Sequence, residues 1–229
     1  MAIHGPGDPG DGQPGLTWAR SAAAAAGTRA VVPNPHFADT DRMTSAGALH
    51  NQLLVAMPGM ADPNFADTVT LICEYNDAGA LGIVVNRPMT LTLGDLLEQL
   101  DVHVSNPAVA ALPVLDGGPV GRERGFVLHS PGSRYESTVA VSGDIQLTLS
   151  KDVLDALAAG GGPRRALVAL GYAGWEAGQL EAEIRANTWL NVPATPEILF
   201  DVPFADRWLV ATRSLGIHPS QLSSDAGHA

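Results

Sequence analysis

The sequence predicts an α/β (α+β) protein in which helices cover a mixed, largely antiparallel β-sheet within a single compact body. Short β-branched runs alternate with Gly, Pro and Asp turn residues through the middle of the chain. Apolar residues at helical spacing follow capping residues at several places. Strands that neighbour one another in sequence are joined by short turns, which favours antiparallel pairing. Because 45% of the 229 residues are hydrophobic, the chain can bury one substantial core.

The first residues have a composition unlike the rest of the chain. Five Gly and three Pro fall within the first fifteen residues, and little there is apolar enough to offset the entropy of ordering. The five consecutive alanines at 22–26 form too short an apolar block for a signal peptide. We therefore expect residues 1–45 to be a flexible Gly/Pro/Ala-rich extension and residues 46–229 to form one domain.

The domain is predicted to begin with a strand and an antiparallel hairpin. Residues 51–57 form a short apolar run that a Pro-Gly pair stops, which is typical of a buried strand. Asp62 followed by Pro63 predicts the start of a helix, with Asp62 as N-cap. The β-branched runs 69–73 and 81–85 are joined by an Asn-Asp-Ala-Gly turn, which predicts a hairpin.

Helices and short strands alternate through the rest of the domain. Pro88 ends the second hairpin strand, because proline lacks the N–H that a ladder requires. Thr92 and Asp95 have the spacing of a helix cap, and Ser150 is expected to cap a second helix. The predicted helices are 93–100, 151–159, 178–186, one beginning at 195–197, and 204–215. The predicted strands are 113–115, 126–129, 139–142, 145–149, 166–170 and 188–191.

Composition and motifs exclude several classes of function. The net charge of −11 opposes a phosphate backbone and argues against direct nucleic-acid binding. No run approaches the ~18 apolar residues of a membrane helix, and phosphate-loop, dinucleotide, zinc-protease and nucleophile-elbow motifs are absent from the sequence. The only cysteine, Cys73, forms no internal disulfide, which favours a cytoplasmic location. We predict no metal and no cofactor.

Two groups of residues at predicted strand ends are candidates for ligand binding. Arg87, after Asn86, has a planar fork that fits a carboxylate or phosphate, although it could equally pair with a surface acid. Gly117 and Gly118, before Pro119, expose N–H groups that could approach an anion or another backbone, or they could simply form a tight turn.

Three further features have a functional and a structural interpretation. His129 stands where a strand runs into a turn, so it could act as an acid/base group or ligand contact, or be a hydrogen-bonded structural residue. Cys73 lies inside a strand, which favours a buried inert thiol over a reactive one. The aromatic and polar group Trp175, Gln179, Glu183 and Trp189 could line a cleft, or the tryptophans could be core anchors.

Several of these segments together resemble the AlgH/YqgE-like family of bacterial cytosolic proteins. The matching segments are 79–88 (GALGIVVNRP), 117–120 (GGPV), 126–129 (FVLH), 170–175 (LGYAGW), 178–184 (GQLEAEI), 189–190 (WL) and the closing 227–229 (GHA). The resemblance covers about residues 49–229 in order. It implies one compact body with a mixed sheet and a regulatory role for the family, and it implies no established catalytic residue.

The leading hypothesis is a non-enzymatic regulatory or interaction protein that binds an unidentified small molecule or protein partner. We expect one solvent-reachable hollow to contain ten residues: Asn86, Arg87, Gly117, Gly118, Pro119, His129, Trp175, Gln179, Glu183 and Trp189. The alternative hypothesis is an enzyme of unknown reaction type that uses His129 or Glu183 as acid/base. An enzyme would need such groups to converge on one reactive point, whereas a binding surface needs only shape and a few anchors.

Overall fold

A computed structural model describes residues 49–216 of the chain. The expected flexible extension, residues 1–45, and the matching chain end at 227–229 lie outside the described residues. Within them the chain forms a mixed sheet of ten strands with several helices around it, so the predicted fold class is confirmed. None of the helices in this range is long and apolar enough to cross a membrane.

The ten strands form one curled sheet that is antiparallel except for a single parallel pair, β5 with β9. The order along the main path is β10-β1-β2-β3-β9-β6-β8-β7, and β5 and β4 branch from β9. The strands are β1 Gln52–Ala56, β2 Val69–Asn76, β3 Gly79–Val84, β4 Pro88–Thr92, β5 Pro113–Asp116, β6 Val120–His129, β7 Thr138–Ala140, β8 Gln146–Thr148, β9 Ala166–Glu176 and β10 Trp189–Pro193.

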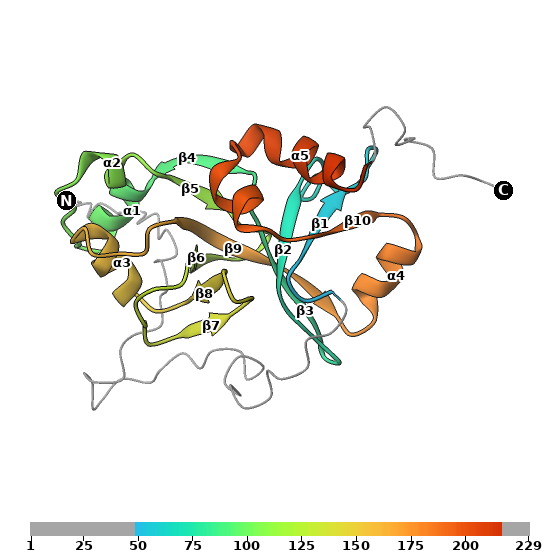
Figure 1. Cartoon of the computed structure of the whole chain (residues 1–229), viewed down its shortest axis with the longest axis horizontal. Coiled ribbons are helices and arrows are strands. Elements are labelled where there is room, and N and C mark those ends of the chain that lie inside the picture. The colour runs from blue at the N-terminus through green and yellow to red at the C-terminus, as the bar shows by residue number, and fades with distance from the viewer. Residues whose placement is uncertain (1–48, 217–229) are drawn as a thin grey trace, which may run out of the picture.

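Strand β9 connects the two halves of the sheet (Figure 1). Its second half, residues 173–176, pairs with β3, whereas residues 168–170 pair with β5. Strand β6 occupies the other edge of β9. Because β3 and β5 share one edge of the same strand, they meet end to end, and the N–H of Val84 donates to the carbonyl of Gly117 at 2.9 Å.

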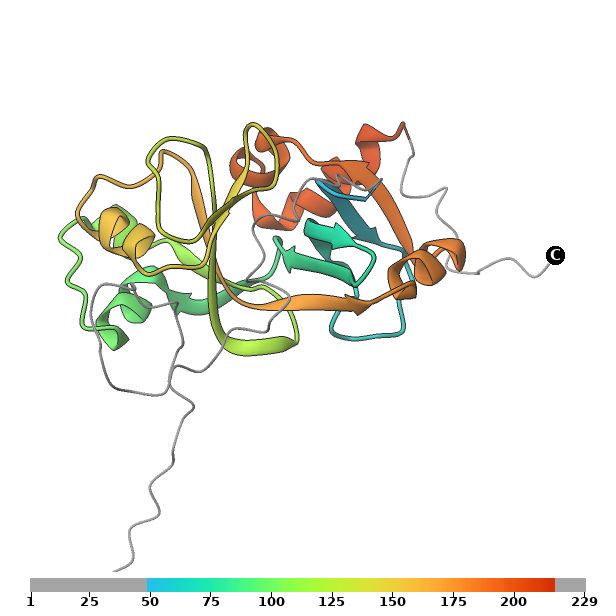
Figure 2. The ribbon, with the colours of Figure 1, turned by 90° about the horizontal axis from the view of Figure 1, so that it is seen from below.

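The helices lie at the two ends of the molecule and over β1 and β10 (Figures 1 and 2). They are α1 Leu93–Gln99, α2 Pro107–Ala110, α3 Asp152–Ala158, α4 Gln179–Arg185, the π-helix η3 Glu197–Asp201, the 3-10 helix η4 Phe204–Asp206 and α5 Arg207–Ser214. Thr92 and Asp95 form the predicted capping box of α1. The Ser150 cap is wrong, because α3 begins one residue later, at Asp152, and the Ser150 hydroxyl donates to the Asp152 carboxylate.

Three clusters of buried side chains hold the layers together. The curl of the sheet brings Leu53, Leu71 and Ile83 into one core with Phe126 and Leu128. A second cluster packs α1 and α3 against β5, β6 and β9, and a third packs α4 against β1, β2 and the end of β9. The two opposite faces of β9 are therefore both covered, which explains why its first half reads as a continuous apolar run.

Three strands differ most from the prediction. Strands β6 and β9 are longer than expected, because glycine-containing stretches that looked like turns continue the ladder through irregular pairing. Strand β4 was missed, because Pro88 was interpreted as the end of the hairpin. Pro88 instead opens an edge strand whose only strand partner in residues 49–216 is β5, a place where a missing N–H costs little.

Two glycines allow β9 to pass close to the β5–β6 connection. Gly118 has φ +147° and Gly171 has φ +76°. A Cβ on Gly118 would lie 2.3 Å from the carbonyl carbon of Tyr172, and one on Gly171 would lie 2.4 Å from the carbonyl oxygen of Gly118. Both contacts are with backbone, which cannot move aside as a flexible side chain does, so these positions require glycine.

Gly118→Ala is expected to lower the free energy of unfolding by at least about 2 kcal/mol, because the new methyl group meets backbone in a region of φ that L-residues avoid. Urea unfolding measures the change. Gly132→Ala is the matched control, since a Cβ there meets nothing within 4 Å. Equal stability of the two variants would contradict the close approach.

Candidate functional site

The segment after β1 forms a single helical turn and not the helix predicted from Asp62 and Pro63. The Asp62 carboxylate caps the turn by accepting from the N–H of Asn64 at 2.9 Å, and the Asp62 carbonyl accepts from Ala66. The predicted start is therefore correct in its capping chemistry. The helix does not continue, because Asp67 has φ +58° and the chain turns into β2.

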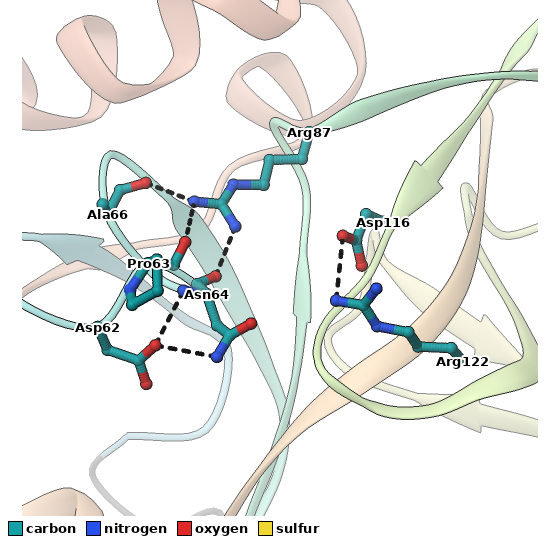
Figure 3. A network of polar contacts seen from close by, with 7 residues as sticks. All are labelled: Asp62, Pro63, Asn64, Ala66, Arg87, Asp116 and Arg122. Carbon is teal, nitrogen blue, oxygen red and sulfur yellow. Dashed lines mark hydrogen bonds and ion pairs between the residues drawn. The ribbon is translucent and has the colours of Figure 1, made fainter.

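Arg87 binds the carbonyl groups at the end of this turn (Figure 3). Its Nη1 donates to the Asn64 carbonyl at 2.6 Å, and its Nη2 donates to the carbonyls of Pro63 at 3.1 Å and Ala66 at 2.7 Å. Its neighbour Asn86 accepts from the N–H of Val69 and donates to the Asp67 carbonyl. Asn86 and Arg87 thus tie the end of β3 to the turn that precedes β2.

Asp116 and Arg122 lie across from Arg87, on the other half of the sheet (Figure 3). A shallow open hollow with a cavity volume of about 10 Å³ lies between them, and its lining residues are Asn64, Val84, Arg87, Asp116, Gly118, Pro119 and Arg122. Arg122 Nη2 is 3.8 Å from Asp116 Oδ2, and the two side chains are 65% and 33% exposed. We call this the inter-strand hollow, because it lies where β3 and β5 end against each other.

The glycine pair is explained mainly by backbone packing. The N–H of Gly117 donates to the Leu170 carbonyl at 2.8 Å, and Gly118 packs against β9. Of the open interpretations for this pair, close approach to another backbone is the one that the geometry supports. Gly118 and Pro119 nevertheless line the inter-strand hollow, so they contribute its shape.

The tryptophan group consists of two buried indoles joined by the partly buried carboxylate of Glu183, with Gln179 exposed beside it. Glu183 Oε2 accepts from the indole N–H of Trp175 at 3.0 Å and of Trp189 at 2.8 Å, and its Oε1 accepts from Gln179 at 2.9 Å. The tryptophans are only 6% and 4% exposed. The interpretation of these two residues as core anchors is therefore supported, and they do not form the walls of an open cleft.

Phe65 links this aromatic cluster to the hollow. Its ring stacks on Trp175 with centroids 6.1 Å apart and meets the edge of Trp189 at 5.5 Å. Phe65 belongs to the same helical turn as Asn64, which lines the hollow. The tryptophans thus contribute to the hollow indirectly, because they pack against the 62–67 turn that forms one of its walls.

His129 lies in the core and outside the hollow. It is 0% exposed, and its Nδ1 is 2.9 Å from the Ser130 carbonyl, which only accepts, so Nδ1 carries the proton. Its Nε2 is 2.8 Å from Thr148 Oγ1. Burial lowers the pKa of His129 below its ordinary value of 6.5. The structural interpretation of this histidine is the one that its contacts support.

His129 and Glu183 do not converge on one point. His129 pairs with Ala166 at the start of β9, whereas Trp175, which binds Glu183, lies nine residues further along the strand. At 3.3 Å per residue this separation is about 30 Å. The expectation that all ten residues share one hollow is therefore wrong: Arg87, Gly118 and Pro119 line it, and the aromatic cluster and His129 lie elsewhere.

Cys73 is a buried thiol, 1% exposed, and burial raises its pKa far above the ordinary value. This supports the inert interpretation. In residues 49–216 no group of three or more His, Cys, Asp or Glu side chains is arranged to hold a metal ion.

Sequence reasoning missed four residues that line the hollow: Asn64, Val84, Asp116 and Arg122. Arg122 lies in the irregular first half of β6, ahead of the strand predicted at 126–129, and Asp116 lies just after the strand predicted at 113–115, before the two glycines. The signal that could have located Asp116 is its position at the end of a predicted strand, next to Gly117 and Gly118.

The fold and the hollow define a single-body α/β protein with a curled sheet and a small polar depression between two strand ends. Residues 53–220 match the family model described as AlgH-like. The chain therefore belongs to the AlgH-like family, as the resemblance in the sequence predicted.

Relatives and one solved structure agree with this assignment. The chain is 54% identical to a UPF0301 protein of Ralstonia nicotianae over 181 residues, covering 79% of this chain and 95% of the relative. It is 50% identical to a UPF0301 protein of Vibrio parahaemolyticus over 185 residues, covering 79% and 99%. The solution structure of AlgH from Pseudomonas aeruginosa matches with a TM-score of 0.67 and 49% identity, covering 81% and 98%.

Glu183→Ala is expected to lower the free energy of unfolding by about 2 kcal/mol, because it leaves two indole N–H groups without their acceptor. Glu183→Gln should cost less, since its amide oxygen still accepts. Urea unfolding followed by tryptophan fluorescence measures both. The control is Glu98→Ala on the exposed face of α1, and a loss no greater than this control's would contradict the structural role of Glu183.

The free energy of unfolding is expected to decrease as the pH is lowered, because of the protonation of His129. Because burial lowers the pKa of His129 in the folded state, the unfolded chain takes up its proton first. The contribution is fully present above the ordinary pKa of 6.5 and is lost as the pH falls below it. Unfolding free energies measured from about pH 7 to about pH 5 should fall more steeply than in His129→Gln. Parallel curves would refute this linkage.

Proposed function

We propose that this protein is a non-enzymatic binding protein that recognises a polar group of a small molecule or protein partner in the inter-strand hollow. The observation that carries the proposal is the state of Arg122. Its side chain is 65% exposed, and within residues 49–216 its one polar partner is Asp116, in a 3.8 Å ion pair beside a depression that Arg87 also lines. A cation held this loosely at a concave site can bind a ligand at little cost.

Contacts within the described residues argue for binding over catalysis. An enzyme needs an acid/base group that can reach a substrate. His129 is buried with both ring nitrogens close to fixed partners, and both oxygens of Glu183 already accept hydrogen bonds. The Cys73 thiol lies inside the core. The inter-strand hollow instead offers a few anchors and a shape, which is what recognition requires.

The charge and the cysteine suggest where binding takes place. A net charge of −11 opposes direct association with nucleic acid, which favours a small molecule or a protein as the partner. The single cysteine forms no internal disulfide, which supports a role in the reducing cytoplasm. A regulatory role in bacteria agrees with these properties.

The proposal predicts that some metabolites raise the melting temperature of the wild-type protein by several degrees, because a ligand that binds only the folded state stabilises it by mass action. A thermal-shift screen against metabolites and nucleotides tests this. Each hit is repeated with Arg122→Ala, which removes a wall of the hollow, and the shift should disappear.

Arg164→Ala is the matched control, since Arg164 is an exposed arginine that does not line the hollow. This variant should keep every shift. Hits that survive in Arg122→Ala would show that ligands bind elsewhere, and the proposal would then fail.

A further inference from the structure

Arg122 has hydrogen-bonding capacity that its surroundings do not use. A charge-assisted N–H···O bond is about 2.7–2.9 Å long, so the 3.8 Å distance to Asp116 is an ion pair without such a bond. Within residues 49–216 its guanidinium makes no hydrogen bond. The planar fork therefore keeps the geometry that accepts two oxygens of one group.

Arg87 provides a second, rigidly held cation on the facing wall. Three of its five N–H donors bind carbonyls of the 62–67 turn, which fixes the side chain in place. The remaining donors have no partner among the described residues. Since Arg87 is already positioned, binding a ligand there costs little side-chain entropy.

The hollow is positive although the protein is acidic. Two guanidinium groups, of Arg87 and Arg122, face one carboxylate, of Asp116, in a chain whose net charge is −11. The local positive charge of the hollow attracts anions, whereas cations are attracted to the acidic residues on the rest of the surface. The local charge therefore selects for a negative group.

The size of the hollow limits what it accepts. Its cavity volume is about 10 Å³, roughly the room that one water molecule needs, whereas pockets for whole drug-sized ligands occupy about 300–1,000 Å³. Gly118 and Pro119 form part of its lining without long side chains. The hollow therefore admits about one oxygen atom of a ligand group, and the rest of that group stays at its open mouth in contact with solvent.

We infer that the ligand presents a compact oxyanion, a carboxylate or a phosphate, which replaces Asp116 as the partner of Arg122 while Arg87 holds its second side. This inference rests on the proposed function of the hollow. Asp116 then competes with the ligand for Arg122 and keeps the guanidinium near the hollow when no ligand is bound. Arg122→Gln and Asp116→Asn, which remove one charge each, must therefore change the affinity for anions in opposite directions.

The test is a titration of ¹⁵N-labelled protein at low salt with inorganic phosphate and, separately, with malonate. Backbone amide shifts of Asn64, Gly118 and Arg122 report on the hollow. Arg122→Gln should weaken binding at least about tenfold, because it removes a charge-assisted contact. Asp116→Asn should strengthen it by about threefold or more, since it removes the competing charge. Arg164→Gln should leave the affinity unchanged.

Two further arms separate the inference from the proposed function. Arg122→Lys keeps the charge without the fork, and an intermediate affinity is expected. Putrescine and glucose serve as cationic and neutral probes. Shifts in the hollow with these probes and none with phosphate or malonate would overturn the oxyanion and leave the proposed function standing.

The other outcomes are equally decisive. Weaker anion binding by Asp116→Asn would overturn the exchange of partners at Arg122, once unchanged thermal unfolding shows that the variant is folded. Stronger binding of phosphate than of malonate, or the reverse, assigns the oxyanion to one source. If no probe of any charge moves these amides, both the inference and the proposed function fail.

Discussion

The sharing of one edge of β9 by two strands determines where the hollow forms. Strand β3 pairs with residues 173–176 of β9 and β5 with residues 168–170, so both strands end at the same point. This arrangement requires the close backbone approach of Gly118 and Gly171. Beyond the junction the chain leaves both strands, and the residues that follow them, Arg87 on one side and Pro119 on the other, form opposite walls.

Arginine side chains that bind carbonyl groups hold the end of β3 in position. On one side Arg87 binds the 62–67 turn. On the other, the buried Arg207 of α5 donates to the carbonyls of Val85 and Val202, and its guanidinium lies 4.3 Å from the Phe204 ring. Burial lowers the pKa of Arg207 to about 10, and the group stays charged at neutral pH. Such an interaction satisfies several carbonyl groups with one side chain, which an uncharged residue of the same length could not do.

The sequence predicted the class of the fold, the hairpin of β2 and β3, the capping box of α1 and the buried state of Cys73, because each depends on neighbours in the chain. The prediction failed where contacts with residues distant in the sequence determine the length of a helix or strand. The helix at Asp62 stops after one turn, and Arg87, more than twenty residues later, binds the carbonyls that this leaves. Strand β9 continues past Gly171 because β3 lies beside it. For the same reason the candidate residues were wrongly grouped: His129 pairs with Ala166 at the start of β9, and Trp175 lies nine residues further along that strand.

The same residue type has three different states in this molecule, and the surroundings decide which of them suits binding. Arg207 is enclosed and bound to carbonyls, so replacing its partners would require unfolding of α5. Arg87 is bound to carbonyls and also lines the hollow, so it can contact a ligand there without giving up these partners. Arg122 faces a carboxylate across 3.8 Å in solvent, an interaction worth little in free energy. Of these three arginines, only Arg122 can change its partner at a small cost in free energy. Because its present partner is the carboxylate of Asp116, that change depends on the charge of the ligand. In the binding that we propose, recognition at this hollow is therefore a competition between two anions for one guanidinium.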